Sequence, residues 1–407
     1  MERQYSCDVG CSKGLECEMD QSTAMEPEGN KIIDGNSGDE IFYYFAKSGT
    51  DRDAIDQVMA KYPARITSFL KALLKKSEAL RRQYLPSPEE LNSIGTPTPF
   101  EEGKEASKTY GLERVYRDRV LLTPHFDCPA YCRFCYKKSR VMRHQRGMSF
   151  EEIDKALSEI GQMEEVRGIV VTGGDPMMGL EKLFHLLEGA MRLENIFEVR
   201  VGTRTILNSP QIFTDAVCDR LAAFNRPNRK DPSKSKYLAL NVHFNHPHEL
   251  EPEVMELCWQ LTSRGVTLRN QCVLLKGIND DAQTIKKLFS LLVRNNMIPY
   301  YFNHCMPVEG SDHLRCSVQK GLEIYRYLCT ESSTVIPNYV YANHAGKVHL
   351  GPDSPLIYVQ HKGSRYIKTE MPYKAEEFRR ITRKDLPPLH EETKGGFIQG
   401  MYLDGRD

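Results

Sequence analysis

A regular alternation of strand-like and helix-like segments constrains the fold of this chain of 407 residues. Six short runs rich in β-branched and aromatic residues follow one another at 119–124, 168–172, 198–203, 237–244, 267–275 and 298–304. Helical segments such as 149–163 and 281–294 lie between them, and the first opens with a capping box of Ser149 and Glu152. Strands that alternate with helices pair in parallel through right-handed crossovers. The sequence therefore predicts an α/β fold, with too few units for a closed eight-stranded barrel.

The segments on either side of this alternation differ in composition. Residues 1–35 are polar and glycine-rich, which predicts a disordered arm, and 36–115 show the apolar spacing of a helical N-terminal extension. We assign 116–310 to the barrel and 311–407 to a C-terminal segment. From about Tyr373 the chain has little periodicity, so we expect it to wrap the surface or join a subunit contact.

Composition narrows the classes of function. The chain has 55 basic and 55 acidic residues, which argues against a nucleic-acid partner bound through bulk charge. No apolar run approaches the roughly 20 residues of a membrane helix, and the N-terminus lacks the apolar core of a secretory signal. Twelve cysteines without such a signal predict a reducing cytoplasm and free thiols. Cys7, Cys11 and Cys17 are read as loose thiols of the arm, with metal binding as the alternative.

Three cysteines stand close together at Cys128, Cys132 and Cys135, with the spacing C-x3-C-x2-C. Three thiolates can hold three irons of a four-iron cluster and leave the fourth iron open to a substrate or cofactor, whereas electron-transfer clusters usually have four cysteine ligands. Zinc held with His125 or His144 is the alternative, although zinc ligands usually come as separated pairs. The triplet therefore predicts an open iron–sulfur cluster and chemistry at its free iron.

The triplet, with Phe134 before its last cysteine, resembles the signature of radical S-adenosylmethionine (SAM) enzymes. The resemblance implies an open six-unit (β/α)6 partial barrel and a [4Fe–4S] cluster that binds SAM and reductively cleaves it to a 5′-deoxyadenosyl radical. The turn Gly173, Gly174, Asp175 and Pro176 after the second strand is similar to the family's site for the SAM amino group. An outside electron donor, flavodoxin or ferredoxin, is also implied.

Further segments resemble the lysine 2,3-aminomutase family, in order and over about residues 60–360. They are the segments around Arg65, Gly202–Arg204, His243–His246 and Asn270–Asn279. In this family His243 and Gln271 match contacts to SAM. The resemblance implies an isomerase that moves the α-amino group of an amino acid to the β-carbon.

The resemblance also implies pyridoxal 5′-phosphate (PLP), bound covalently by a lysine that matches Lys347. The family's glycine-rich run before this lysine is reduced here to Gly346, and a solvated loop lysine is the alternative. Arg119 and Tyr116 match residues at the PLP phosphate. A second phosphate-binding arginine aligns with Val115, so Arg114 and Arg117 are the candidates to replace it.

The substrate contacts of lysine-specific members are altered in this chain. Their two aspartates for the distal ammonium align with Met306 and with Ala342 or Asn343, and the residue that would meet the α-carboxylate is Lys137 instead of arginine. A buried ammonium without a counter-charge is costly. We therefore expect a substrate other than free lysine, unless a carboxylate such as Glu309 or Asp312 takes part.

Other functions remain open at this point. A SAM- and PLP-dependent desaturase, a radical enzyme without PLP, and a non-catalytic iron–sulfur protein are the alternatives to the aminomutase. The chain has no cysteine after Cys329, so we expect no interface zinc of the kind the family's tetramers hold in a C-terminal tail, and any homo-oligomer must be held otherwise.

Overall fold

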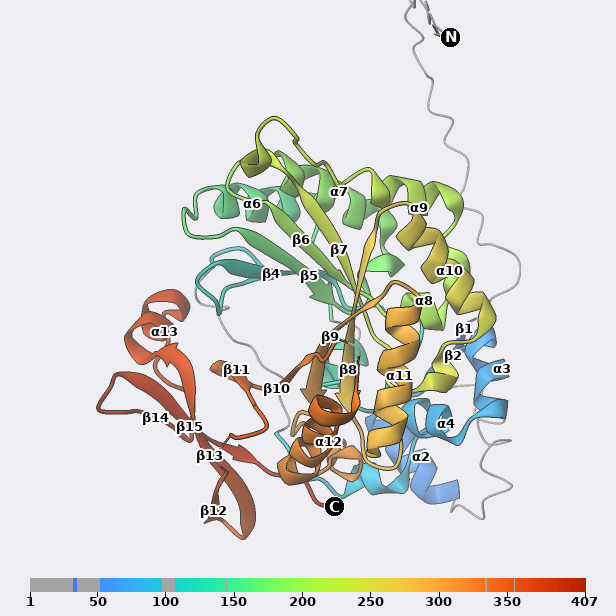
Figure 1. Ribbon diagram of the computed structural model, residues 1–407, viewed down its shortest axis with the longest axis vertical. Coiled ribbons are helices and arrows are strands. Elements are labelled where there is room, and N and C mark those ends of the chain that lie inside the picture. The colour runs from blue at the N-terminus through green and yellow to red at the C-terminus, as the bar shows by residue number, and fades with distance from the viewer. Residues whose placement is uncertain (1–31, 35–51, 97–106, 144, 334, 355) are drawn as a thin grey trace, which may run out of the picture.

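A nine-stranded sheet forms the centre of the fold (Figure 1). The structure is a computed structural model, and it describes residues 32–34, 52–96, 107–143, 145–333, 335–354 and 356–407. The strand order is β11-β10-β9-β8-β7-β6-β5-β4-β3, so neighbours in the sheet are also neighbours in the sequence. Among the described residues β3 and β11 are the two edges, and the sheet curls without closing on itself. This is the expected open partial barrel.

The strands of this sheet have the following bounds: β3 Leu112–Glu113, β4 Arg119–His125, β5 Gly168–Gly173, β6 Glu198–Gly202, β7 Tyr237–Val242, β8 Thr267–Leu274, β9 Ile298–His304, β10 Asn338–Asn343 and β11 Gly346–His349. The six predicted parallel strands are confirmed as β4 to β9. A seventh parallel strand, β10, pairs with β9, while β3 and β11 add antiparallel edges.

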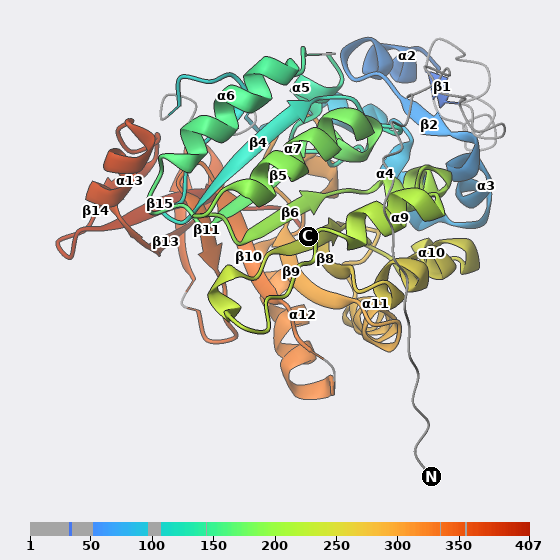
Figure 2. The same ribbon diagram turned by 90° about the horizontal axis from the view of Figure 1, so that it is seen from above.

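Helices surround the outer face of the sheet, as Figure 2 shows from above. Their bounds are α5 Lys138–Val141, α6 Phe150–Gly161, α7 Leu180–Arg192, α8 Thr205–Asn208, α9 Asp215–Ala222, α10 Pro252–Ser263, α11 Ala282–Arg294 and α12 Val318–Glu331. The predicted capping box at the start of α6 is present, because Ser149 accepts from the N–H of Glu152 and Glu152 accepts from the N–H of Ser149. Single 3₁₀ turns, η3 Pro176–Met178, η4 Pro210–Ile212, η5 Pro232–Lys234, η6 Pro247–Glu249 and η7 Asp312–Leu314, lie in the connections.

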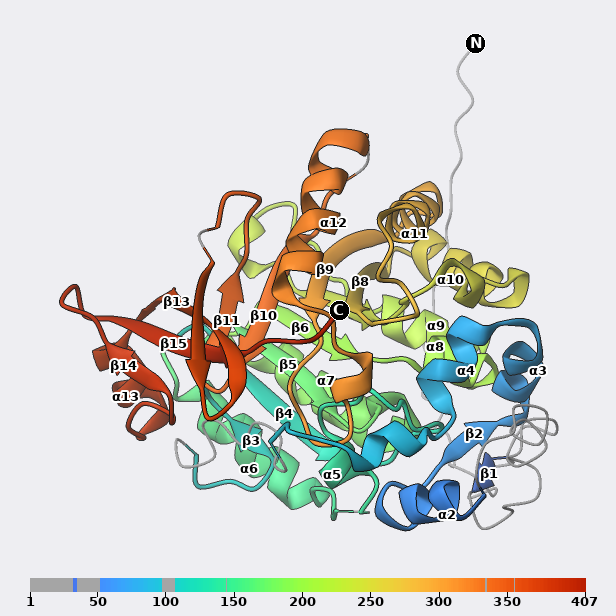
Figure 3. The ribbon, with the colours of Figure 1, turned by 90° about the horizontal axis from the view of Figure 1, so that it is seen from below.

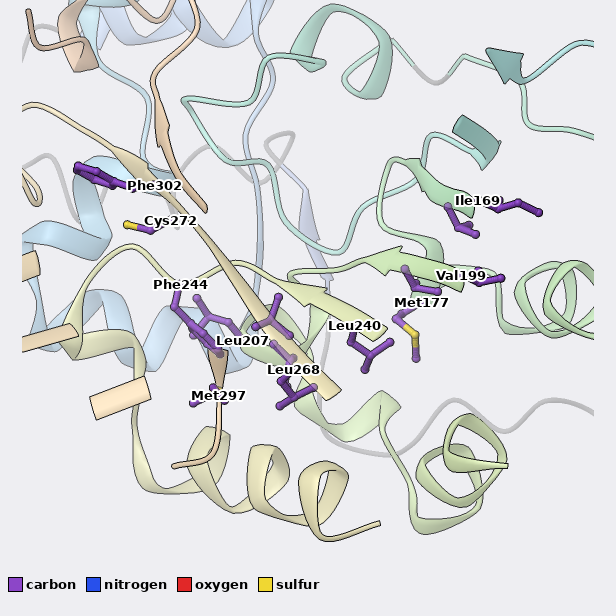
Figure 4. Packing of buried hydrophobic residues seen from close by; sticks show 14 of the residues in the cluster. Ile169, Met177, Val199, Leu207, Leu240, Phe244, Leu268, Cys272, Met297 and Phe302 are labelled. Atoms are coloured by element: carbon purple, nitrogen blue, oxygen red, sulfur yellow. The ribbon is translucent and has the colours of Figure 1, made fainter. Parts of the chain in front are cut away.

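The two faces of the sheet have different environments. Along β8 buried and half-buried residues alternate strictly, so Leu268 and Cys272 pack outward under the helices while Arg269 and Gln271 point into the barrel. Figure 4 shows outward residues such as Val199 and Leu240 in this core. Each such side chain stabilises the fold by roughly 1.5–3 kcal/mol on burial. The inner face is left with polar and charged side chains.

The predicted helical extension is present before the barrel. It contains β1 Ile32–Asp34, α2 Arg52–Lys61, β2 Arg65–Thr67, α3 Ser68–Lys76, α4 Glu78–Tyr84 and the 3₁₀ turn η1 Pro88–Leu91. Glu90 of η1 forms a fully buried ion pair with Arg133 of the cysteine loop at 2.7 Å. This pair fixes the extension to the barrel. Cys7, Cys11, Cys17 and most of the predicted arm lie outside the described residues.

The C-terminal residues form a second sheet, which the weak periodicity of the sequence from about Tyr373 did not predict. It contains β12 Ile357–His361, β13 Ser364–Lys374, β14 His390–Glu392 and β15 Phe397–Leu403, in the antiparallel order β12-β13-β15-β14, with α13 Ala375–Thr382. Alternation in the long strand β13 is interrupted by an irregular register near Glu370 and Lys374, which weakens its sequence pattern. The chain ends against the start of α12, where Asp407 accepts from the N–H of Ser317 at 3.0 Å (Figure 3).

The second sheet and α13 contact the barrel at two places. It contacts β11 directly, and Arg380 of α13 forms an ion pair with Glu165, in the connection before β5, at 2.9 Å. None of the helices in the described part of the chain has the length and apolar character needed to cross a membrane.

Candidate functional site

The cysteine triplet lies in the loop after β4, at the carboxyl end of the parallel strands. Cys128, Cys132 and Cys135 are half-buried and form no disulfide. Burial raises the pKa of Cys128 well above its usual value, and the charges of Asp175, Cys135 and Cys132 raise it further. Burial, followed by the charge of Cys132, raises the pKa of Cys135 to about 11. Because the charges of Cys132 and Cys135 both act on the Cys128 thiol, these sulfurs lie near one another.

The arrangement of these thiols does not suit a single metal ion. Across the described residues, no three histidine, cysteine, aspartate or glutamate side chains converge on one ion-sized position. Nδ1 of His125 already accepts from the N–H of Asp127 at 3.2 Å, and His144 is outside the described residues. Zinc needs four convergent ligands, whereas each thiolate of a four-iron cluster binds a different iron. The donor set therefore fits an open cluster better than zinc.

Gly173 and Gly174, at the end of β5, allow close packing against the start of the cysteine loop. Gly173 has φ of +121°, and a Cβ there would lie 2.3 Å from the carbonyl oxygen of His125. A Cβ on Gly174 would lie 2.2 Å from the carbonyl oxygen of Asp127. The N–H groups of Gly174 and Asp175 donate to these two carbonyls at 2.9 and 2.8 Å. The glycine pair thus positions the backbone that leads into the triplet.

The carboxylate of Asp175 is buried and accepts four hydrogen bonds from the chain. Oδ1 accepts from the N–H of Met177 at 3.2 Å and the hydroxyl of Thr203 at 2.8 Å. Oδ2 accepts from the N–H groups of Arg204 at 2.7 Å and Thr205 at 2.8 Å. A carboxylate offers about four acceptor positions, so all are used. Asp175 therefore ties together the turns that follow β5 and β6.

His243, directly after β7, and Gln271, on β8, lie beside each other on neighbouring segments of the sheet. The register pairs Val242 with Asn270, which brings the following residues, His243 and Gln271, to the same inner face. The ring of His243 packs against Phe134 at 5.4 Å, and its Nε2 lies 3.1 Å from Oδ1 of Asn245. Burial lowers the pKa of His243 well below its usual value, so its imidazole is neutral at pH 7.

Lys137 and Lys138 follow the triplet but point to different places. The Lys137 amine donates to the hydroxyl of Thr172 on β5 at 2.9 Å, and burial lowers its pKa to about 8. The Lys138 amine is bound by Glu90 at 3.2 Å and by the carbonyl of Gly310 at 2.9 Å. Only Lys137 of the pair therefore faces the inner surface of the barrel.

Lys347 lies on β11 and faces the inner surface from the opposite edge of the sheet. Its amine is 3.6 Å from the ring centroid of Tyr301 on β9. Burial, then the charges of Arg119 on β4 and Arg200 on β6, lower its pKa to about 7. Strands β4 and β6 near one edge of the sheet and β11 at the other edge thus contribute charges around one amine. This arrangement requires the sheet to curl around the amine.

Arg119 and Tyr116 lie beside this lysine. The Arg119 guanidinium stacks on the ring of Tyr116 at 4.3 Å, and that ring meets Tyr373 of β13 at 6.1 Å. By contrast, Arg114 and Arg117 pair with Glu165 at 3.2 and 3.1 Å, outside the barrel.

The residues that align with the family's substrate-binding aspartates lie near β11, at the edge of the sheet that carries Lys347. Ala342 is the direct strand partner of Lys347. The amide oxygen of Asn343 accepts from the N–H of Ala345 at 2.7 Å. Met306 is half-buried after β9. Glu309 pairs with Lys61 at 2.5 Å and Asp312 with Arg315 at 3.0 Å, so both carboxylates already have cationic partners.

Comparison with known proteins agrees with this geometry. The profile described as "Radical SAM superfamily" matches residues 122–288. The chain is 30% identical to the L-lysine 2,3-aminomutase of Clostridium subterminale, over 77% of this chain and 78% of that protein. This chain belongs to the radical SAM 2,3-aminomutase family.

Other relatives fall in the same family. A protein of Aquifex aeolicus (strain VF5), provisionally named as an L-lysine 2,3-aminomutase, is 33% identical over 80% of this chain and 87% of its own length. The glutamate 2,3-aminomutase of Clostridioides difficile (strain 630) is 29% identical over 83% of this chain and 78% of its own length. The crystal structure of Streptococcus suis SuiB aligns with a TM-score of 0.41 and 14% identity, over 67% of this chain and 60% of that one. As a radical SAM aminomutase-family protein, the chain is an isomerase.

The structure adds residues near Lys347 and near the cysteine triplet that the sequence analysis missed. Arg200, Tyr301 and Tyr373 surround Lys347, and Arg204 contacts the cysteine triplet. Arg204 lies in a segment similar to the family, but nothing in the sequence indicated its partner. The inward position of Arg200 in an alternating strand was the available signal for its role.

Proposed function

We propose that this chain is a SAM- and PLP-dependent 2,3-aminomutase of an amino acid other than free lysine. The observation that carries the proposal is the position of Lys347, which is half-buried inside the open barrel and near enough to Arg119 and Arg200 for their charges to act on its amine. About half of the amine is unprotonated at pH 7, and attack on an aldehyde requires this form. A solvated loop lysine would keep its ordinary pKa.

The surroundings of Lys347 fit PLP. Arg119 and Arg200 place two guanidinium groups near the amine, and a phosphate dianion favours such donors. Arg200 would replace the arginine that the family carries at the position of Val115. When bound, PLP supplies the group that holds the substrate nitrogen during its migration from the α- to the β-carbon. Tyr116 and Tyr373 would limit the mobility of Arg119 and close the site to water.

The other half of the site lies at the cysteine loop. We assign Cys128, Cys132 and Cys135 as ligands of the cluster, and the turn Gly173–Pro176 with His243 and Gln271 as the SAM site. The cluster and SAM together supply the radical that abstracts hydrogen from the substrate. The chain's own task is to hold the reacting carbon between the two cofactors and exclude other hydrogen donors. Flavodoxin or ferredoxin would supply the electron.

The charges of the inner face favour a substrate without a side-chain ammonium. Lys137 would bind the α-carboxylate, and Arg119, Arg200 and Lys347 add positive charge further along the barrel. The nearby carboxylate of Glu198 is already paired with Arg200 and Arg269. A neutral or acidic amino acid meets these charges at lower cost than lysine, and glutamate is the first to test because a relative is named for it.

The test uses anaerobic protein with reconstituted cluster, PLP, SAM and dithionite, offered glutamate, lysine and a pool of neutral amino acids. We expect 5′-deoxyadenosine and a product of unchanged mass with an acidic or neutral amino acid, and much less with lysine. Preferential turnover of lysine would refute the substrate assignment. A product two mass units lighter would instead indicate a desaturase.

A further inference from the structure

Arg204 joins the proposed cluster site to the helical extension. It follows β6, and its guanidinium is buried among groups from four segments of the chain. Nη1 donates to Sγ of Cys132 at 2.9 Å. Nη2 donates to Gln83 Oε1 at 2.6 Å and Glu249 Oε1 at 3.1 Å, and Nε donates to the carbonyl of His243 at 3.2 Å.

The orientation of this guanidinium is fixed on every side. The rings of Tyr84 and Phe134 lie 4.8 and 5.1 Å from its central carbon. Its backbone N–H is held by Asp175 at 2.7 Å. A side chain held in this way cannot leave the sulfur without breaking several buried contacts.

The ion pair with Glu249 does not by itself explain Arg204. Glu249 also accepts from Gln83 Nε2 at 2.6 Å and from the N–H of Asn245 at 2.7 Å, so it has partners on both oxygens without the arginine. Pairing with Glu249 therefore does not explain why Nη1 of Arg204 donates to the Cys132 sulfur.

We propose that Arg204 raises the reduction potential of the cluster through its hydrogen bond to the Cys132 sulfur and its positive charge. Reduction adds one electron from an external donor to the cluster and makes it more negative. A cation and a hydrogen bond at a ligand sulfur stabilise that reduced form. Glu249 lies on the far side of the guanidinium and offsets part of this charge. The inference rests on the proposed cluster ligands and requires neither PLP nor substrate.

The test is a redox titration of the reconstituted protein without SAM, followed by electron paramagnetic resonance, with dithionite as the electron source. We expect R204Q to shift the midpoint potential to a more negative value. We expect E249Q to shift it to a more positive value, because the arginine charge is then no longer offset. R204K, which keeps the charge but not the planar fork, should lie between R204Q and the unchanged protein.

The matched control is R81Q. Arg81 lies on α4 near Gln83, but its side chain pairs with Glu78 at 2.7 Å and with the carbonyl of Leu74 at 2.7 Å. Its removal should leave the potential unchanged. Iron and sulfide content, measured on every variant, separates a shift of potential from a loss of cluster.

The opposite shifts of R204Q and E249Q distinguish tuning from loosening of the site, which would move both variants in one direction. An unchanged potential in R204Q with a full cluster would overturn the proposal. If R204Q fails to assemble a cluster, the midpoint potential of E249Q becomes the test. An unchanged potential in E249Q would likewise overturn the proposal. Failure of the aminomutase assignment would leave these potentials as predicted, since no substrate is present.

Discussion

The amine of Lys347 on β11 lies 3.6 Å from the ring centroid of Tyr301 on β9, with β10 between the two strands in the sheet. An aromatic face favours the protonated amine, but burial and the charges of Arg119 and Arg200 oppose it and lower the lysine pKa to about 7. The effects of burial and of the two arginine charges on the lysine pKa therefore outweigh the effect of the Tyr301 ring. At pH 7 about half of the Lys347 side chains thus carry an unprotonated, nucleophilic amine.

Replacing Lys347 with alanine should abolish covalent capture of PLP and leave the cluster intact. We expect the visible absorbance of the bound coenzyme to disappear and turnover to fall by roughly a thousandfold or more. Absorbance spectra and iron content of K347A measure the two effects separately. Undiminished coenzyme absorbance in K347A would remove Lys347 from the site.

The pH dependence of PLP capture follows from the lowered pKa of Lys347. Below about pH 7 the amine is charged and cannot attack, so the rate should rise about tenfold per pH unit there and level off above about 7. Stopped-flow absorbance of PLP-free protein mixed with PLP measures this rate. A rate that keeps rising to pH 9 or beyond would mean an ordinary solvated lysine.

Removing either arginine beside Lys347 should weaken PLP binding. A hydrogen bond to a charged group contributes about 1.5–3 kcal/mol, so R119Q and R200Q should each raise the Kd by roughly ten- to a hundredfold. Each should also raise the pKa of Lys347 and move the capture profile to higher pH. R114Q is the control, because Arg114 pairs with Glu165 outside the barrel. An effect of R114Q equal to that of R200Q would contradict this phosphate site.

Lys137 should act on substrate binding more than on the cofactors. K137M removes the ammonium that faces Thr172 and should raise KM by roughly ten- to a hundredfold for the α-carboxylate of the substrate. Because burial lowers the pKa of Lys137 to about 8, binding should weaken as pH rises through that value. K155M, at an exposed position of α6, is the control. Equal KM values for K137M and K155M would show that Lys137 does not bind substrate.

Substitution of Gly174 by alanine should displace the cysteine loop. The added Cβ would lie 2.2 Å from the carbonyl oxygen of Asp127, and backbone must move to accept it, at a cost of roughly 1–3 kcal/mol. We expect G174A to lose thermal stability and cluster content, measured by calorimetry and iron analysis. G168A is the control, since its nearest atom would be 3.7 Å away. A full cluster in G174A would show that the loop tolerates the shift.

Much of the fold could be predicted because its signals are local. The six strands β4 to β9 and the capping box of α6 follow from residue patterns within single segments. The second sheet could not be predicted, since the irregular register in β13 interrupts its alternation and Gly400 is needed only where His390 of β14 packs against it. The structure also gives Asp175 four partners from two turns, which no segment reveals alone.

The sequence by itself determined the cysteine triplet, the parallel α/β fold and the family to which the chain belongs, because each is carried by residues near one another in the chain. Only the tertiary structure decided which cations surround Lys347 and which donor reaches the Cys132 sulfur. Arg119, Arg200 and Lys347 come from β4, β6 and β11, and Arg204 is 72 residues from Cys132. The curl of the sheet brings these groups together, and at such short range charge and desolvation set their chemistry.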